Sequence, residues 1–172
     1  MLNTSVYRRS ALAAAMAILV PALMAAPSQA VAGTATTTLG VSLTINAGCT
    51  VSSTPIAFPA QGVISAAVSQ TGSLVVTCTN TSPYNVGLDQ GAGAGSTVTN
   101  RLMTGPAAAT VAYGIYQDAG HVTNWGKTVG TDTKAGTGNG TAQTLTVYGN
   151  ILPQTTPAPG AYADTVNVTV TF

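Results

Sequence analysis

The chain has 172 residues, of which 45% are hydrophobic and only 5% charged, and its formal net charge is +1. This length is sufficient for one domain with a buried core. Five basic residues are too few for a basic patch, which argues against a nucleic-acid partner.

Residues 1–30 have the features of a secretory signal peptide. A pair of arginines precedes an apolar run at residues 11–20, and small residues lead up to Ala30. We therefore expect cleavage after Ala30, with Ala32 as the alternative, and export from the cell. No later stretch reaches the ~18 apolar residues that a membrane-spanning helix needs, so no transmembrane span is expected.

The residues after the signal peptide carry very little charge. They hold three basic and four acidic side chains, so their formal net charge is 3 − 4 = −1. A freely soluble monomer normally displays many charges of both signs. This composition therefore favours a protein that is built into an assembly.

A strictly alternating segment at residues 35–45 comes first in the exported chain. Its apolar face is formed by Leu39, Val41, Leu43 and Ile45. Such alternation predicts a β-strand. The flexible residues 46–48 follow, and we expect a pivot at Gly48 that divides residues 31–48 from a body at residues 49–172.

The only two cysteines, Cys49 and Cys78, have 78 − 49 − 1 = 28 residues between them. An even pair in an exported protein predicts a disulfide, here between the strand after the pivot and the strand that ends at Cys78. Two free buried thiols are the alternative. The spacing and the single histidine, His121, argue against a metal site.

The rest of the chain reads as short strands separated by turns. Strands are expected at residues 74–77, 84–88, 111–116, 144–148 and 166–172. Glycine, proline and asparagine predict turns at residues 80–83, 91–95, 136–140 and 153–160. No segment has helical periodicity. The pattern predicts an all-β fold, an antiparallel β-sandwich in one domain.

The alternating segment at residues 35–45 has two interpretations. It belongs either to the sandwich of its own chain or to that of another copy, by β-strand addition. The last predicted strand presents Val166, Val168, Val170 and Phe172, and no strand follows it. A sandwich that lacks one strand would expose an edge and an open core, which bind whatever strand is offered.

Residues that could carry chemistry are few. His121 lies in a turn-like stretch, where an exposed structural histidine is a better explanation than a catalytic base. The four aspartates flank turns, and Asx-type hydrogen bonds explain them. The glycine-rich segments at residues 91–95 and 136–140 lack the context of a phosphate loop. Trp125 and the tyrosines are interpreted as packing residues rather than a sugar platform. No catalytic residue, cofactor or metal is expected.

From about Cys49 to Phe172, the chain resembles the spore coat protein U domain, the subunit type of archaic chaperone–usher pili. The resemblance is carried by an ordered set of motifs at residues 70–78, 83–84, 113–119, 125–126, 143–149, 153–154, 160–166 and 168–172. The pair Ala163 and Asp164 departs from the more polar pair expected there.

The resemblance implies an incomplete immunoglobulin-like sandwich and a structural, non-enzymatic role at the cell surface. It implies that residues around 34–45 are a donor strand, and that the groove edge at Val166 to Phe172 accepts such a strand. The implied partners are further copies or related subunits, a periplasmic chaperone and an outer-membrane usher. A protective coat protein is the alternative function, and a secreted glycan-binding module is a weaker one.

Overall fold

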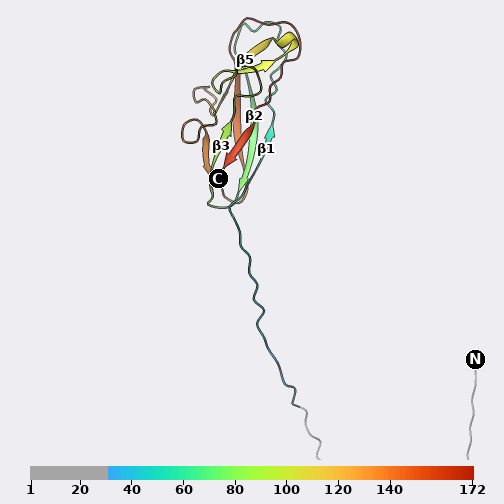
Figure 1. The fold of residues 1–172 in the computed structure, drawn as a ribbon, viewed down its shortest axis with the longest axis vertical. Helices are drawn as coiled ribbons and strands as arrows, with labels where there is room; N and C mark the ends of the chain where they lie inside the picture. Colours follow the sequence, from blue (N-terminus) through green and yellow to red (C-terminus); the bar gives the residue numbers. More distant parts are fainter. Residues whose placement is uncertain (1–30) are drawn as a thin grey trace, which may run out of the picture. The chain divides into compact units, whose positions relative to one another are not determined.

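The computed structural model describes residues 31–172, and the signal peptide expected over residues 1–30 lies outside them. The chain divides into two units, Met1–Ser42 and Leu43–Phe172. In the first unit, the described residues 31–42 contain no helix or strand and are exposed. The second unit holds all the strands of the described chain (Figure 1).

Eight β-strands and one short 3₁₀ turn make up the second unit. The strands are β1 (Cys49–Thr54), β2 (Val68–Cys78), β3 (Pro83–Leu88), β4 (Arg101–Thr104), β5 (Thr110–Tyr116), β6 (Lys134–Thr137), β7 (Ala142–Ile151) and β8 (Val168–Thr171), with η1 at Pro106–Ala108. Five strands form one sheet in the order β1-β2-β7-β5-β4, and three form a second in the order β6-β3-β8. Every pairing is antiparallel, which confirms the predicted all-β sandwich.

The core lies between the sheets because each long strand buries alternate side chains. β2 contributes Leu74, Val76 and Cys78, while β3 contributes Tyr84, Val86 and Leu88 from the other sheet. The five predicted strands at residues 74–77 through 166–172 correspond to β2, β3, β5, β7 and β8. A period of two, with one face buried, is the physical basis of both the prediction and the sandwich.

The structure differs from two local expectations. β4 and β6 were not predicted, and β6 overlaps the first two residues of the loop expected at residues 136–140. The final strand begins at Val168 rather than at Val166. The alternating segment at residues 35–45 has no strand assignment in this single chain, and neither has any residue between 31 and 48. Its pairing with another copy stays a prediction.

Candidate functional site

An open groove lies between the edge strands of the two sheets. β1 is an edge of the five-stranded sheet and β8 is an edge of the three-stranded sheet. A cavity of about 450 Å³ lies between the segments 53–58 and 162–168. Its floor consists of core side chains from both sheets, namely Leu74, Leu88, Ile115 and Val147. These four side chains are only 3–5% exposed, so the groove reaches down to the hydrophobic core.

The segment that follows β1 forms one wall of the groove. Ile56 and Phe58 pack over two glycines on the inner face of the five-stranded sheet. A Cβ on Gly72 would lie 2.9 Å from Ile56 Cγ1, and a Cβ on Gly149 would lie 2.9 Å from both Ile56 Cγ2 and Phe58 Cζ. These distances leave no room for a larger residue. The two glycines, both within the motifs of the resemblance, therefore let this wall approach the sheet.

The opposite wall consists of residues 163–168 and leads into β8. Asp164 accepts hydrogen bonds from the backbone N–H of Ala92 at 2.7 Å and of Thr165 at 2.7 Å. Its second oxygen accepts a bond of 2.7 Å from the Tyr113 hydroxyl. Burial, and then the bond to Asp164, raise the pKa of Tyr113, so this phenol remains protonated and a donor.

Asp89, just after β3, holds the same wall at Asn167. Its carboxylate accepts hydrogen bonds from the Asn167 backbone N–H at 2.9 Å, the Asn167 side chain at 2.7 Å and the Gly91 backbone N–H at 2.9 Å. Local Asx bonding was the expectation for all four aspartates. Asp118 and Asp132 meet it, whereas Asp89 and Asp164 also join segments that are far apart in the sequence.

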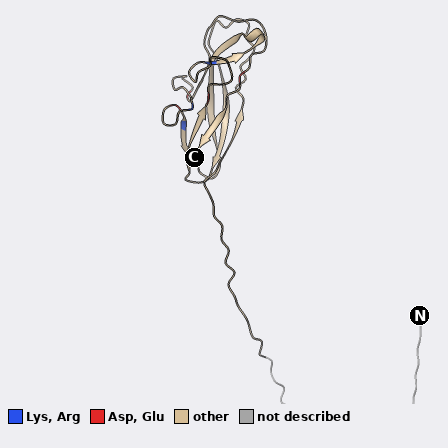
Figure 2. Ribbon diagram, viewed as in Figure 1, with Lys and Arg blue, Asp and Glu red and all other residues tan. Residues whose placement is uncertain are grey.

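Arg101 is a fully buried cation beneath this corner of the sandwich. Its guanidinium donates to four backbone carbonyls, those of Asp89 at 2.8 Å, Val98 at 2.8 Å, Leu88 at 3.1 Å and Trp125 at 2.7 Å. Lys and Arg are rare along the ribbon in Figure 2, and Arg101 is 0% exposed. Sequence reasoning missed its role, because nothing local distinguishes it from a surface arginine.

Two of the four residues of the predicted acceptor edge line the groove. Val166 and Val168 line the cavity. Val170 is half-buried and packs against the core, whereas Phe172 is 56% exposed and does not line the cavity. The predicted edge therefore covers the β8 side of the groove. The opposite wall at residues 53–58 was not anticipated.

The predicted donor residues are highly exposed. Leu39, Val41, Leu43 and Ile45 are between 74% and 89% exposed. Large apolar side chains on one face of an alternating segment are seldom left in water unless they have a partner elsewhere. The structure itself gives this segment no strand partner within residues 31–172.

The predicted disulfide between Cys49 and Cys78 is present, with an S–S distance of 2.02 Å. It joins the first residue of β1 to the last residue of β2. Immediately before it, Gly48 donates to Thr79 Oγ1 at 2.8 Å, and its carbonyl accepts from Thr79 N at 3.0 Å and Thr79 Oγ1 at 3.1 Å. Gly48 is therefore held to the end of β2 by three hydrogen bonds, and the pivot expected there stays a prediction.

The candidates for chemistry do not converge. His121 is in a turn, as expected, but it is half-buried rather than exposed, and its ring packs edge-on against Tyr116 with centroids 5.3 Å apart. Trp125 is 0% exposed and donates from Nε1 to Val86 O at 2.8 Å, so it is a core residue. Among residues 31–172, no group of three or more His, Cys, Asp or Glu side chains could hold a metal.

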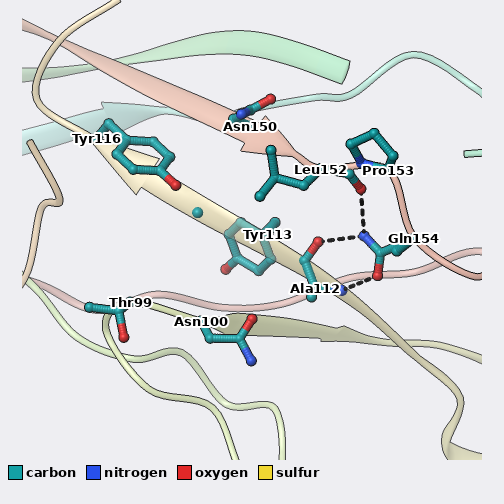
Figure 3. Close-up of a pocket in the computed structure, with 10 residues that line it drawn as sticks. Thr99, Asn100, Ala112, Tyr113, Tyr116, Asn150, Leu152, Pro153 and Gln154 are labelled. Atoms are coloured by element: carbon teal, nitrogen blue, oxygen red, sulfur yellow. Dashed lines mark hydrogen bonds between the residues drawn. The ribbon is translucent and has the colours of Figure 1, made fainter. Parts of the chain in front are cut away.

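A second, smaller hollow of about 190 Å³ lies where β5 meets the end of β7 (Figure 3). Gln154 borders it and pairs with β5 through its side chain. Its amide accepts from Ala112 N at 2.9 Å and donates to Ala112 O at 2.8 Å and Leu152 O at 3.2 Å. Beyond the end of β7, the Gln154 side chain thus takes the place of a neighbouring strand for the backbone of β5. Its role is structural, and it explains the motif at residues 153–154.

The comparisons with known proteins agree with this architecture. No curated protein matches the sequence. Among solved structures, a chain of the CsuC–CsuE chaperone–tip adhesion subunit pre-assembly complex, from the archaic chaperone–usher Csu pili of Acinetobacter baumannii, has a similar fold, with a TM-score of 0.56 and 20% identity. The match covers 75% of this chain and 41% of that chain, so this protein corresponds to less than half of its length.

In the described part of the chain, no helix is both long and apolar enough to cross a membrane. The family model of the Spore Coat Protein U domain matches residues 35–169, a range that includes both the exposed alternating segment and the groove. The sandwich, the disulfide and this match over most of the sequence lead to one assignment: the chain belongs to the Spore Coat Protein U domain family.

Proposed function

We propose that this protein is a structural subunit of an archaic chaperone–usher pilus and that it polymerises by donor-strand complementation. Residues 34–45 of one copy fill the open groove of the next. A periplasmic chaperone occupies the groove before assembly, and an outer-membrane usher builds the fibre at the cell surface, where it serves attachment or biofilm formation. Residues 1–30 direct export.

The open groove is the observation that carries this proposal. The described strand β1 pairs only with β2, and β8 pairs only with β3, so each has an edge whose backbone groups are available to a further strand. The floor between them consists of apolar core side chains. A β-strand with one apolar face is the ligand that such a site fits.

The alternating segment has the matching chemistry. Burying one large apolar side chain contributes about 1.5–3 kcal/mol, so the four exposed residues offer roughly 6–12 kcal/mol before ordering costs. Each ladder hydrogen bond adds a net ~0.5–1.5 kcal/mol. A 12-residue strand spans about 40 Å at ~3.3 Å per residue, which allows it to reach well beyond its own subunit.

A pair of substitutions in neighbouring positions tests the proposal. Val41→Asp places a carboxylate on the apolar face of the strand, where an unpaired buried charge costs several kcal/mol. Ser42→Asp places the same charge on the other face, where it should be tolerated. Surface extracts run on gels without heating should show a ladder of polymers that collapses on boiling.

We expect this ladder for the wild-type protein and for Ser42→Asp, and its loss for Val41→Asp. Polymers of wild-type length from Val41→Asp, or equal loss with both variants, would contradict donor-strand assembly by this segment. A chain lacking residues 34–45 should still bind a chaperone but should fail to cap a neighbouring copy.

A further inference from the structure

The wall of the groove that leads into β8 lacks a sheet partner along part of its length. Ala163 is bridged to Thr104, with N–O distances of 2.9 and 3.1 Å, and pairing with β3 begins only at Val168. Residues 164–167 lie between these two points and have no strand assignment. This stretch includes Val166, which faces the groove. The Asn167 carbonyl accepts a bond from the Asp89 backbone N–H at 3.1 Å, but the backbone of residues 164–166 has no such partner in the described chain. Side-chain contacts must therefore set the position of these residues.

Two carboxylates provide that attachment. Asp164 is itself in the unpaired stretch and holds it to the loop at Ala92 and to the Tyr113 hydroxyl. Asp89 holds the other end, through both the backbone and the side chain of Asn167. Hydrogen bonds to an ionised carboxylate are about twice as strong as those between neutral groups. The wall is therefore fastened at both ends by charge-assisted bonds.

Ala92 lies in an exposed loop, but the other points of attachment are tied to the core. Tyr113 is a buried residue of β5, and the carbonyl of Asp89 accepts a bond from the buried guanidinium of Arg101. The same guanidinium holds the carbonyls of Leu88 and Trp125, both in the core. The carboxylates thus connect the wall to groups that cannot move without disturbing the sandwich.

We propose that Asp89 and Asp164 are positioning residues that keep the β8-side wall in its strand-accepting position before a donor strand arrives. This inference rests on the proposed function. A preformed site avoids the ordering cost that a loose wall would add to each binding event. If the wall occupies the open position only for a fraction of the time, the apparent affinity for the strand falls by that fraction.

The test measures binding of a labelled synthetic peptide, residues 34–45, to the exported full-length subunit. The subunit carries Val41→Asp, which keeps copies from capping one another. Association and dissociation rates are compared for Asp89→Ala, Asp164→Ala and the control Asp118→Ala. Asp118 accepts bonds only within its own turn, from Val122 N at 3.2 Å and Thr123 N at 2.7 Å.

We expect association with Asp89→Ala and Asp164→Ala to slow by about tenfold, as for a wall that is open one-tenth of the time, while dissociation changes little. The control should bind as the parent does. A general loss of stability would not slow association while leaving dissociation unchanged. It would lower the amount of folded protein, but the folded molecules would still bind the peptide at the parent's association rate. Wild-type association rates for both alanine variants would overturn the inference.

Two further outcomes are decisive. If Asp164→Ala does not fold, Tyr113→Phe removes the single hydroxyl bond to Asp164 and keeps the aromatic ring in the core. An association rate for Tyr113→Phe equal to that of the parent would then refute the role of Asp164. If the parent subunit does not bind the peptide at all, the proposed function itself fails, together with this inference.

Discussion

Removing the Cys49–Cys78 disulfide should affect β1 more than any other strand. The bond closes a loop of about 30 residues, for which the chain-entropy model gives about 3.5 kcal/mol of stabilisation. A domain of this size has roughly 5–15 kcal/mol in total. We therefore expect the double variant Cys49→Ala/Cys78→Ala to fold but to lose a large share of its stability.

Urea unfolding measures this loss directly. Trp125 is the only tryptophan and is fully buried, so its fluorescence reports on the core. With a slope of about 1–3 kcal/mol per molar urea, the midpoint should fall by roughly 1.2–3.5 M. Addition of a reductant to the wild-type protein should produce the same shift, and it should leave the double variant unchanged.

The location of the loss is a second, independent readout. β1 pairs only with β2, and most of its side chains are exposed, so little besides the ladder and the disulfide holds it. Hydrogen exchange in the double variant should accelerate first at the β1 amides, while the ladder between β2 and β7 stays protected. An unchanged midpoint together with unchanged β1 exchange would refute the reasoning.

Three further changes have clear expected outcomes. Arg101→Met removes four charge-assisted bonds of about 1.5–3 kcal/mol each and should prevent folding, as judged by circular dichroism; a stable variant would contradict this. Partial burial raises the pKa of Asp89, but its hydrogen bonds, led by that from Asn167, together with Lys127, leave it below the usual 3.8. The ionised carboxylate therefore stabilises the fold above pH 3.8, and this contribution should be lost as the pH falls through the lowered pKa of the folded protein. The urea midpoint should fall over this pH range, and it should fall less in Asp89→Ala than in the wild-type protein. His121→Ala should cost at most about 0.5–1.5 kcal/mol, the value of its aromatic contact, and should leave the polymer ladder intact.

The strands with a buried face could be predicted from the sequence, and the others could not. β2, β3 and β5 place alternating apolar residues on the core, and that period is visible in the residues themselves. β4 and β6 have four residues each, and no side chain of β6 is fully buried. Their formation depends on the neighbouring strands, which local sequence does not encode.

The candidate site was predictable on one side only. Val166 and Val168 belong to an alternating pattern, so their place at a groove edge could be anticipated. The contributions of Asp89 and Asp164 could not, because their partners lie 78 and 72 residues away in the sequence. An aspartate beside a turn has the same local appearance whether it caps that turn or fastens a distant wall.

The clamp at Gly48 and Thr79 has a consequence for a fibre under tension. If residues 34–45 lie in a neighbour's groove, a pull on the fibre enters each subunit at Gly48. There the load reaches Thr79 through hydrogen bonds and Cys78 through a covalent bond, both at the end of β2. It passes to a strand held on both sides, by β1 and β7. The load therefore enters the subunit at the end of a central strand, rather than through the edge strand β1 alone.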